Sequence, residues 1–267
     1  MILPLPLPLI ALLLGLVEGV TEFLPISSTG HLILVERLCG LDGARAEVFA
    51  IFIQLGAVLA VIVEERAKLL GAARGLLWHT GDRVLATSVA IAFVPAVVFG
   101  LLTHHWITEH LFGPRTVAAA LFCGGIAILA VERWKPASTI DQATGVGPGR
   151  AALIGLAQCV SLWPGFSRSA ATILGGLLCG VDRKASTEFS FFLAIPTLGA
   201  ATLYEFWKER HALIPGDLAW LLIATAVSFV VAWGAIRWLL RFVASHDLGV
   251  FAWYRIALAF LVLAALR

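Results

Sequence analysis

Long apolar segments separated by short polar connections dominate the pattern of hydrophobic and polar positions along the chain. Six of them are long enough to cross a hydrocarbon core of roughly 30 Å, which takes about 20 helical residues. These predicted spans cover 47–65, 84–104, 115–133, 187–206, 218–242 and 248–266. The connections carry the charges, as at Glu64, Glu65, Arg66 and Lys68. We therefore expect an all-α polytopic membrane protein.

Two further apolar stretches are too short to cross, and each is stopped by a proline, at Pro25 and at Pro164. A helix of about 15 residues reaches roughly 22 Å, which enters a bilayer without crossing it. A second short helix follows each stretch. The predicted pairs are 9–23 with 29–38 and 151–162 with 169–180, within hairpins 9–38 and 151–180. Non-helical backbone at that depth needs protein or a wet cavity around it, so we interpret both as re-entrant hairpins.

The two hairpins resemble each other in sequence. A shift of 140 residues aligns 15–40 with 155–180, and nine of these 26 positions are identical, where chance would give about two. Three predicted spans separate the hairpins, and an odd number of crossings inverts the second repeat relative to the first. We expect one membrane domain, 1–267, with repeats of about 1–140 and 141–267, whose hairpins meet near the midplane.

The amino-acid composition indicates that the surface of the protein faces lipid and not water. Of the 267 residues, 60% are hydrophobic and 13% charged, whereas a soluble domain carries about 25% charged residues. The net charge of +2 and the lack of basic runs argue against a nucleic-acid partner. The four cysteines are dispersed and form no CxxC pair, which is typical of core residues and not of a metal site.

The uneven distribution of Lys and Arg predicts the orientation, because the side richer in them should be cytoplasmic. Eleven lie on one side: Arg66, Lys68, Arg74, Arg83, Arg133, Lys135, Arg150, Arg183, Lys184, Arg237 and Arg241. Six lie on the other: Arg37, Arg45, Arg115, Lys208, Arg210 and Arg267. Both termini, and the face from which the first hairpin enters, are then expected outside. The first basic residue is Arg37, so the apolar N-terminus is expected to be retained and not cleaved.

Charged residues within the first hairpin point to chemistry, since charge inside a membrane is costly and is usually functional. Glu18 and Glu22 lie one helical turn apart on a shared face. A hydroxyl-rich turn with an imidazole follows, formed by Ser27, Ser28, Thr29 and His31. Paired carboxylates are what a divalent cation needs if it is also to bind phosphate oxygens.

The second hairpin supplies groups that suit an anion. Its polar residues are Gln158 and then Gly165, Ser167, Arg168 and Ser169. Arginine offers a bidentate fork to phosphate oxygens, and helix N-termini after Gly/Pro/Ser turns present N–H groups to an anion. Together the two hairpins contain the parts for phosphoryl transfer.

Structural interpretations of the same residues stay open at this point. Glu18 and Glu22 could form a solvated helix face, and the hydroxyls could merely cap the helix that begins near Thr29. His31 alone could be a satisfied core histidine. Arg168 could only neutralise one of the two glutamates as an ion pair.

At these two motifs the chain resembles the undecaprenyl-diphosphate phosphatases of the bacitracin-resistance family, most specifically in EGVTEFLPISSTGH (18–31) and PGFSRS (164–169). The resemblance covers essentially the whole chain. It implies a bacterial inner-membrane hydrolase that removes one phosphate from undecaprenyl diphosphate, regenerates the carrier for peptidoglycan synthesis and confers bacitracin resistance. It also implies inverted re-entrant repeats, a site open to the periplasm and a divalent cation, Mg²⁺ or Ca²⁺. One departure is Ala170, where the family's second motif commonly ends in glycine.

The resemblance and the residue inventory together give a working mechanism. Glu18 and Glu22 would hold the cation, while Arg168 holds the diphosphate. Ser28 would attack the terminal phosphorus with His31 as general base, or His31 itself would attack; Glu22 could instead orient His31. The further substrate-binding candidates are Ser27, Thr29, Ser167, Ser169, Gly165 and Gln158.

Two other functions are alternatives to hydrolysis. Inverted repeats with broken helices are a transporter architecture, so the same midplane site could flip a lipid phosphate between leaflets. The Ser/His/Arg set favours an enzyme, because translocation needs no nucleophile. A rhomboid-like intramembrane serine protease is the other alternative, and it would need a GxSx serine together with a histidine on another helix. The sequence leaves the oligomeric state open, a homodimer included.

Overall fold

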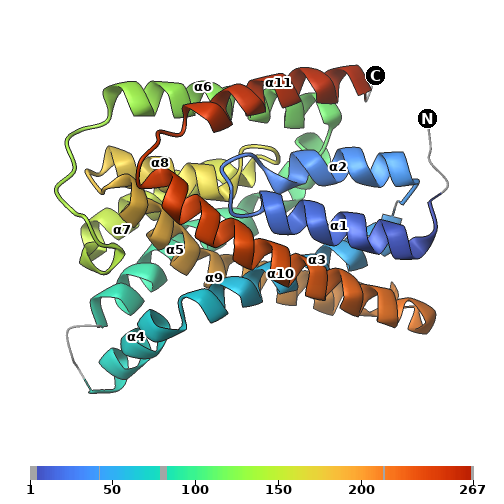
Figure 1. Ribbon diagram of the computed structural model, residues 1–267, viewed down its shortest axis with the longest axis horizontal. Helices are drawn as coiled ribbons and strands as arrows, with labels where there is room; N and C mark the ends of the chain where they lie inside the picture. The colour runs from blue at the N-terminus through green and yellow to red at the C-terminus, as the bar shows by residue number, and fades with distance from the viewer. Residues whose placement is uncertain (1–4, 42, 79–82, 213, 266–267) are drawn as a thin grey trace.

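The structure is a computed structural model that describes residues 5–41, 43–78, 83–212 and 214–265. Its helices are α1 (Leu7–Thr21), α2 (Ser28–Cys39), α3 (Gly43–Glu64), α4 (Arg66–Trp78), α5 (Arg83–His110), α6 (Pro114–Trp134), α7 (Pro148–Gln158), α8 (Arg168–Leu178), α9 (Arg183–Glu209), α10 (Leu218–Val243) and α11 (Gly249–Ala265). Short 3₁₀ turns occur between some of them, and the described residues contain no strand beyond one isolated bridge. The predicted all-α fold is confirmed (Figure 1).

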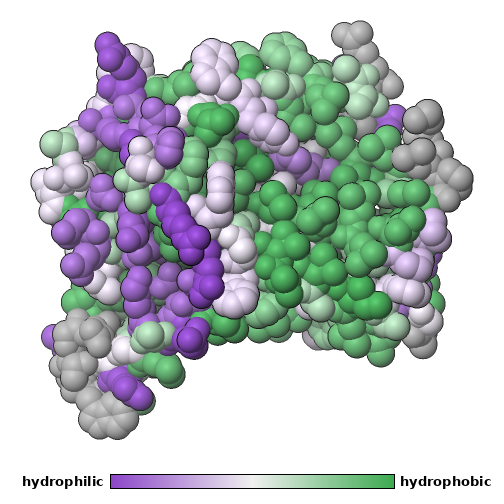
Figure 2. Space-filling model, viewed as in Figure 1, coloured by the Kyte–Doolittle hydropathy of each residue, from purple (hydrophilic) through white to green (hydrophobic). Residues whose placement is uncertain are grey.

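Five of the six predicted spans are helices long and apolar enough to cross a membrane, namely α3, α5, α6, α9 and α10. The sixth is α11, whose 17 described residues are at the short end of the range for a span. Large apolar side chains are exposed on these helices, for example Leu102, Leu203 and Phe260. Figure 2 shows hydrophobic residues over the middle and right of one face, and hydrophilic residues gathered toward the left end.

The hydrophobic pattern does not predict α4, which occupies the connection after α3. This helix has charged residues at Arg66, Lys68 and Arg74 among its apolar ones, so it lacks the long apolar run on which the predicted spans rest. It stays helical because no proline or β-branched run interrupts it. Ala72 packs in one core cluster with Leu85 of α5, which attaches α4 to the bundle.

The two predicted short helix pairs are present as α1–α2 and α7–α8. The first pair begins and ends within two residues of its predicted bounds. The second differs more, since α7 begins at Pro148, ends at Gln158 and continues as a 3₁₀ turn to Leu162. Proline is favoured at the first helical position, which explains the earlier start.

Each hairpin packs against a long helix from the other half of the chain. α1 lies along α10, as Figure 1 shows, and α7 lies along α5. Glycine permits this approach: a Cβ at Gly15 would meet the carbonyl oxygen of Ala224, and one at Gly155 would meet that of Ala92. Gly15 and Gly155 are themselves 140 residues apart. Three further pairs of helices follow this offset approximately, α3 with α9, α5 with α10 and α6 with α11, whereas α4 has no counterpart among the described helices. The division into two repeats stays a prediction that this element order favours.

Candidate active site

The break between the helices of each hairpin ends in a serine with an unusual backbone. Ser27 has φ 71° and Ser167 has φ 78°, and they are the positive-φ residues other than glycine in the described chain. Each serine caps the helix that follows, accepting from Gly30 N at 3.4 Å and from Ala170 N at 3.2 Å. The methyl of Ala170 is fully buried and leaves this cap intact. Left-handed backbone at a non-glycine residue costs of order 1–3 kcal/mol and typically marks a functional site.

The two hairpins meet in a buried ion pair. Arg168, the first residue of α8, donates from Nη2 to Glu22 Oε1 at 3.0 Å, and both side chains are less than a tenth exposed. The open interpretation of Arg168 as an ion-pair partner is therefore confirmed for Glu22. The pair does not exhaust the guanidinium, because Nη1 donates to Ser190 and the buried Nε has no partner among the described residues. A buried unpaired donor is costly, and a phosphate oxygen would satisfy it.

Glu22 also contacts the proposed nucleophile. Ser28 Oγ donates to Glu22 Oε2 at 2.6 Å. Ser28 and Arg168 are 140 residues apart, and each is the first residue of the second helix of its hairpin. Each contacts one oxygen of the Glu22 carboxylate. A carboxylate that accepts a serine hydroxyl at this distance is placed to act as its general base.

His31 points to a partner that the sequence did not reveal. Its Nδ1 lies 2.7 Å from the carbonyl oxygen of Ser27, which can only accept, so Nδ1 carries the proton. Its Nε2 then accepts from the hydroxyl of Tyr254 in α11 at 2.6 Å, with the two rings stacked. No hydrogen bond joins His31 to Ser28 in the described chain. This arrangement favours Glu22 over His31 as the general base. The one sequence signal for Tyr254 is its position next to a charged residue, Arg255, within an apolar span.

Arg255 is a second residue whose role the sequence did not predict. It is completely buried, and its guanidinium donates to the carbonyl oxygens of Pro25 at 3.2 Å and Gly165 at 3.1 Å, and to two carbonyls of α6. Pro25 and Gly165 are the equivalent break points of the two hairpins. Arg255 therefore fastens both breaks to α6 and α11. Its one sequence signal is a lone charge inside an apolar span, which is functional or structural by default.

Glu18 and Glu22 are the candidate ligands for a cation. Glu18 is 1% exposed, and its Oε2 has no hydrogen-bond partner among the described residues. Each oxygen of Glu22 keeps a second lone pair. The described residues contain no group of three His, Cys, Asp or Glu side chains able to hold a metal. Two carboxylates fit a cation whose other ligands are water and substrate oxygens, as is usual for Mg²⁺.

The remaining predicted residues divide between the cavity and the protein interior. Thr29 lines the cavity beside Ser28. Ser169 is fully buried and donates to the carbonyl oxygen of Leu24 at 2.9 Å, and Ser167 Oγ lies 3.0 Å from Ser169 Oγ. Gln158 is the equivalent of Glu18; it is also 1% exposed, and its Oε1 accepts from Thr197 at 3.4 Å. Its Nε2 has no partner within the described chain. None of these hydrogen bonds links Gln158 to Arg168, so its substrate role stays a prediction.

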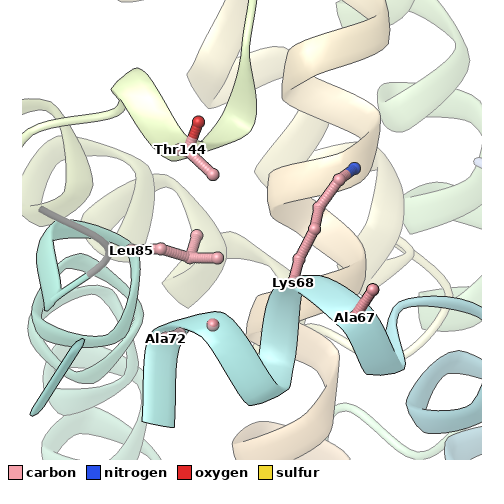
Figure 3. Close-up of a pocket in the computed structure, with 6 residues that line it drawn as sticks. Ala67, Lys68, Ala72, Leu85 and Thr144 are labelled. Atoms are coloured by element: carbon pink, nitrogen blue, oxygen red, sulfur yellow. The ribbon is translucent and has the colours of Figure 1, made fainter. Parts of the chain in front are cut away.

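A cavity of about 960 Å³ leads to this cluster between α2 and α3. Its polar lining comprises Glu18, Ser28, Thr29, Glu36, Arg37, Glu47 and Gln54. Two other cavities lie at the end of the molecule near α4, and neither is lined by Ser28 or by the carboxylates beside it. The one drawn in Figure 3, about 280 Å³, has Lys68 and Thr144 as its polar residues.

The neighbouring cavity near α4, about 640 Å³, holds a network of ion pairs. Lys68 contacts Glu188 at 2.9 Å and Glu65 at 3.3 Å, and Arg237 contacts Glu64 at 2.8 Å. Burial alone would lower the pKa of Lys68, but the two glutamates raise it above its ordinary value. The glutamates thus partly neutralise the cations of this cavity. Because the ion pairs join residues of α3, α4, α9 and α10, they hold these helices together.

The fold and the site define a polytopic membrane protein with buried serine, arginine and carboxylate groups suited to phosphoryl transfer. Comparison with known proteins agrees. The model of the family described as bacitracin resistance protein BacA matches residues 11–261, so the chain belongs to this family. It is 50% identical to undecaprenyl-diphosphatase 1 of Chromobacterium violaceum over 95% of this chain and 94% of the relative. It is 47% identical to the undecaprenyl-diphosphatase of Methylobacillus flagellatus over 95% and 96%.

Proposed function

We propose that the chain is an integral membrane hydrolase that converts undecaprenyl diphosphate into undecaprenyl phosphate and inorganic phosphate. This reaction would recycle the lipid carrier for peptidoglycan synthesis and confer bacitracin resistance. The names of relatives at about 50% identity support the substrate. The observation that carries the chemistry is the Glu22 carboxylate, which accepts the hydroxyl of Ser28 while it pairs with Arg168. Flipping a lipid phosphate would need the cation and the arginine but not this activated serine.

The geometry favours Ser28 as nucleophile. Glu22 takes the proton of Ser28 as Oγ bonds to the terminal phosphorus, and the bond from that phosphorus to the bridging oxygen breaks. Undecaprenyl phosphate leaves with the electron pair. After Glu22 has released the first proton, water attacks the phosphorus of the phosphoserine and Glu22 accepts the water proton. The bond from phosphorus to Oγ breaks, Oγ takes that proton from Glu22 to regenerate the Ser28 hydroxyl, and inorganic phosphate departs. The unpaired Nε of Arg168 and the N–H groups that begin α2 and α8 stabilise the added charge. For His31 to attack instead, its Nε2 would first have to leave Tyr254.

Glu18 and Glu22 are the residues that would hold a divalent cation, Mg²⁺ or Ca²⁺. Such an ion supplies charge neutralisation and orientation for the phosphate oxygens when it is bound. The free Oε2 of Glu18 is the atom in this chain that best supports the assignment.

The decisive test uses purified protein in detergent with a prenyl diphosphate and Mg²⁺ or Ca²⁺. Phosphate should be released, and chelation of the metal should stop it. Ser28→Ala should lose nearly all activity while Ser138→Ala, in an exposed loop, should not. An acid-labile, base-stable phosphoprotein would point to His31 and overturn the serine assignment. No phosphate release under any metal condition would overturn the function itself.

The orientation and the assembly state also belong to this proposal. We place the end rich in Lys and Arg in the cytoplasm and the 960 Å³ cavity toward the periplasm. With the exposed Cys123 replaced by serine, Glu109→Cys should react with an impermeant maleimide on intact cells, and Ser138→Cys only after lysis. The reverse pattern would overturn the orientation. Light scattering in detergent would detect a homodimer.

A further inference from the structure

The cavity in front of Ser28 carries more negative charge than the proposed reaction uses. Glu18, Glu36 and Glu47 line it, and Arg37 is the cationic residue of its lining. A lipid diphosphate is itself strongly anionic, so a cavity of this sign would repel it. A divalent cation would remove that conflict.

Glu36 occupies a specific place in this cavity. Ser28, Leu32 and Glu36 share one face of α2 at intervals of four residues, and all three line the cavity. Eight residues of helix place Glu36 about 12 Å beyond Ser28 along α2. On the neighbouring α1, Glu18 lies about 6 Å beyond Glu22 in the same direction, because the two helices run antiparallel. The carboxylates of Glu36, Glu18 and Glu22 therefore lie at decreasing distances along the helices from Ser28.

The side chain of Glu36 has neither a hydrogen bond nor an ion pair among the described residues, although the residue is half-buried. Its charge acts on that of Glu18, whose Oε2 is buried and has no partner in the described chain. Glu22 and Glu36 are the negative charges that act on Glu18, and the positive charge that acts on it is Arg168, which is already paired with Glu22. An excess of negative charge at a buried carboxylate is unfavourable unless more positive charge is bound. The unpaired oxygen of Glu18 therefore points to a ligand of positive charge.

We propose that Glu36 and Glu18 form an outer cation position, from which a divalent cation enters the site and the lipid diphosphate is admitted as its cation complex. This inference rests on the proposed function and adds Glu36 to it as a cation-recruiting residue. Glu47 differs from Glu36, because the charged residues that act on it are Glu205, Lys208 and Glu209 at the end of α9, and not Glu18. Glu47 is therefore the matched control, a second glutamate on the wall of the same cavity.

The experiment measures cation binding directly, on the full chain in detergent without substrate. Free Mn²⁺ is followed by electron paramagnetic resonance, since Mn²⁺ prefers the same oxygen ligands as Mg²⁺ and Ca²⁺. Glu36→Gln should weaken Mn²⁺ binding about fivefold or more, and Glu47→Gln should weaken it less than twofold. Glu36→Asp should keep most of the affinity. Phosphate release by Glu36→Gln should fall at low Mg²⁺ and recover as Mg²⁺ is raised.

Each outcome decides between the two proposals. Wild-type Mn²⁺ affinity in Glu36→Gln would overturn the outer cation position while leaving the hydrolase intact. Equal weakening of Mn²⁺ binding by Glu36→Gln and Glu47→Gln would also overturn the outer cation position. The loss of affinity would then come from the total negative charge of the cavity and not from a specific contact with Glu36. If the wild type binds Mn²⁺ but never releases phosphate, the proposed function fails instead. Should Glu36→Gln unfold in detergent, the Glu36→Asp variant and the Mg²⁺ dependence of its activity carry the decision.

Discussion

At the scale of single residues, the site depends on one carboxylate that has two partners. Glu22 accepts the hydroxyl of Ser28 with one oxygen and pairs with Arg168 through the other. In a buried environment, removal of one member leaves an uncompensated charge on the other, which costs about 3–5 kcal/mol. Substitutions at Glu22 would therefore disturb stability and chemistry together. The informative changes are those that keep the charge and alter its geometry.

Replacing Arg168 by lysine is such a change. Arg168→Lys should lower phosphate release on the order of 10²-fold, because one ammonium cannot contact Glu22 and Ser190 and still offer a donor to the phosphate. Arg183→Lys is the matched control, since Arg183 also forks onto a glutamate but lies at the start of α9, away from the site. Similar turnover in both variants would contradict the role of Arg168.

Tyr254→Phe isolates the hydroxyl that holds His31. Loss of this bond frees the imidazole to rotate, and we expect activity to fall about tenfold, as is common when a group that orients a histidine is removed. The chain has one other tyrosine, Tyr204, which packs edge-on against His104 outside the site, so Tyr204→Phe is the control. Equal activities would show that Tyr254 does not position His31.

At the scale of elements, close packing of backbones fixes where the helices lie. A Cβ at Gly56 of α3 would collide with the carbonyl oxygen of Thr225 in α10, whereas one at Gly234 of α10 would meet nothing within 4 Å. Packing by small residues replaces the hydrophobic effect as the source of helix association in lipid. Gly15, Gly56 and Gly155, at which an added Cβ would meet backbone of the neighbouring helix, are therefore structural requirements of the fold that holds the site.

Gly56→Ala and Gly234→Ala form a matched pair for this element. The first should destabilise the protein by about 1–3 kcal/mol, because the backbone of α10 cannot yield as a side chain can. The second should be neutral or stabilising by up to about 1 kcal/mol, since alanine favours a helix over glycine. Thermal unfolding in detergent measures both, and equal midpoints would contradict the packing argument.

The sequence predicted those elements whose signal is local. Long apolar runs gave the spans, and Pro25 and Pro164 gave the breaks of the hairpins. The helix α4 was missed because its charges interrupt the apolar run. Contacts between segments far apart in the sequence carried no local signal. The pairing of Glu22 with Arg168, of His31 with Tyr254 and of Arg255 with both breaks arises only when the helices pack.

At the scale of the whole molecule, the two halves of the chain complete each other. The first hairpin rests on α10 and the second on α5, and Glu22 and Arg168 meet only between them. α3 and α9 pack together, as do α6 and α11. Neither half contains a whole site.

A divided chain tests this dependence. Fragments cut between Ala137 and Ser138, in an exposed loop, should each be inactive alone because each hairpin would lose the helix on which it packs. Co-expressed fragments should associate and release phosphate, since the cut leaves every described helix intact. Activity in a single fragment would contradict the exchange of hairpins between the halves.

The packing of α1 on α10 also has a consequence in time. Roughly 200 residues separate these helices, so at typical rates of synthesis α1 waits on the order of ten to forty seconds for its partner. During that interval its glycine face must be covered by lipid or by the insertion machinery. A chain that stops before α10 would lack the helix on which the first hairpin packs, and we expect such a fragment to hold no assembled site.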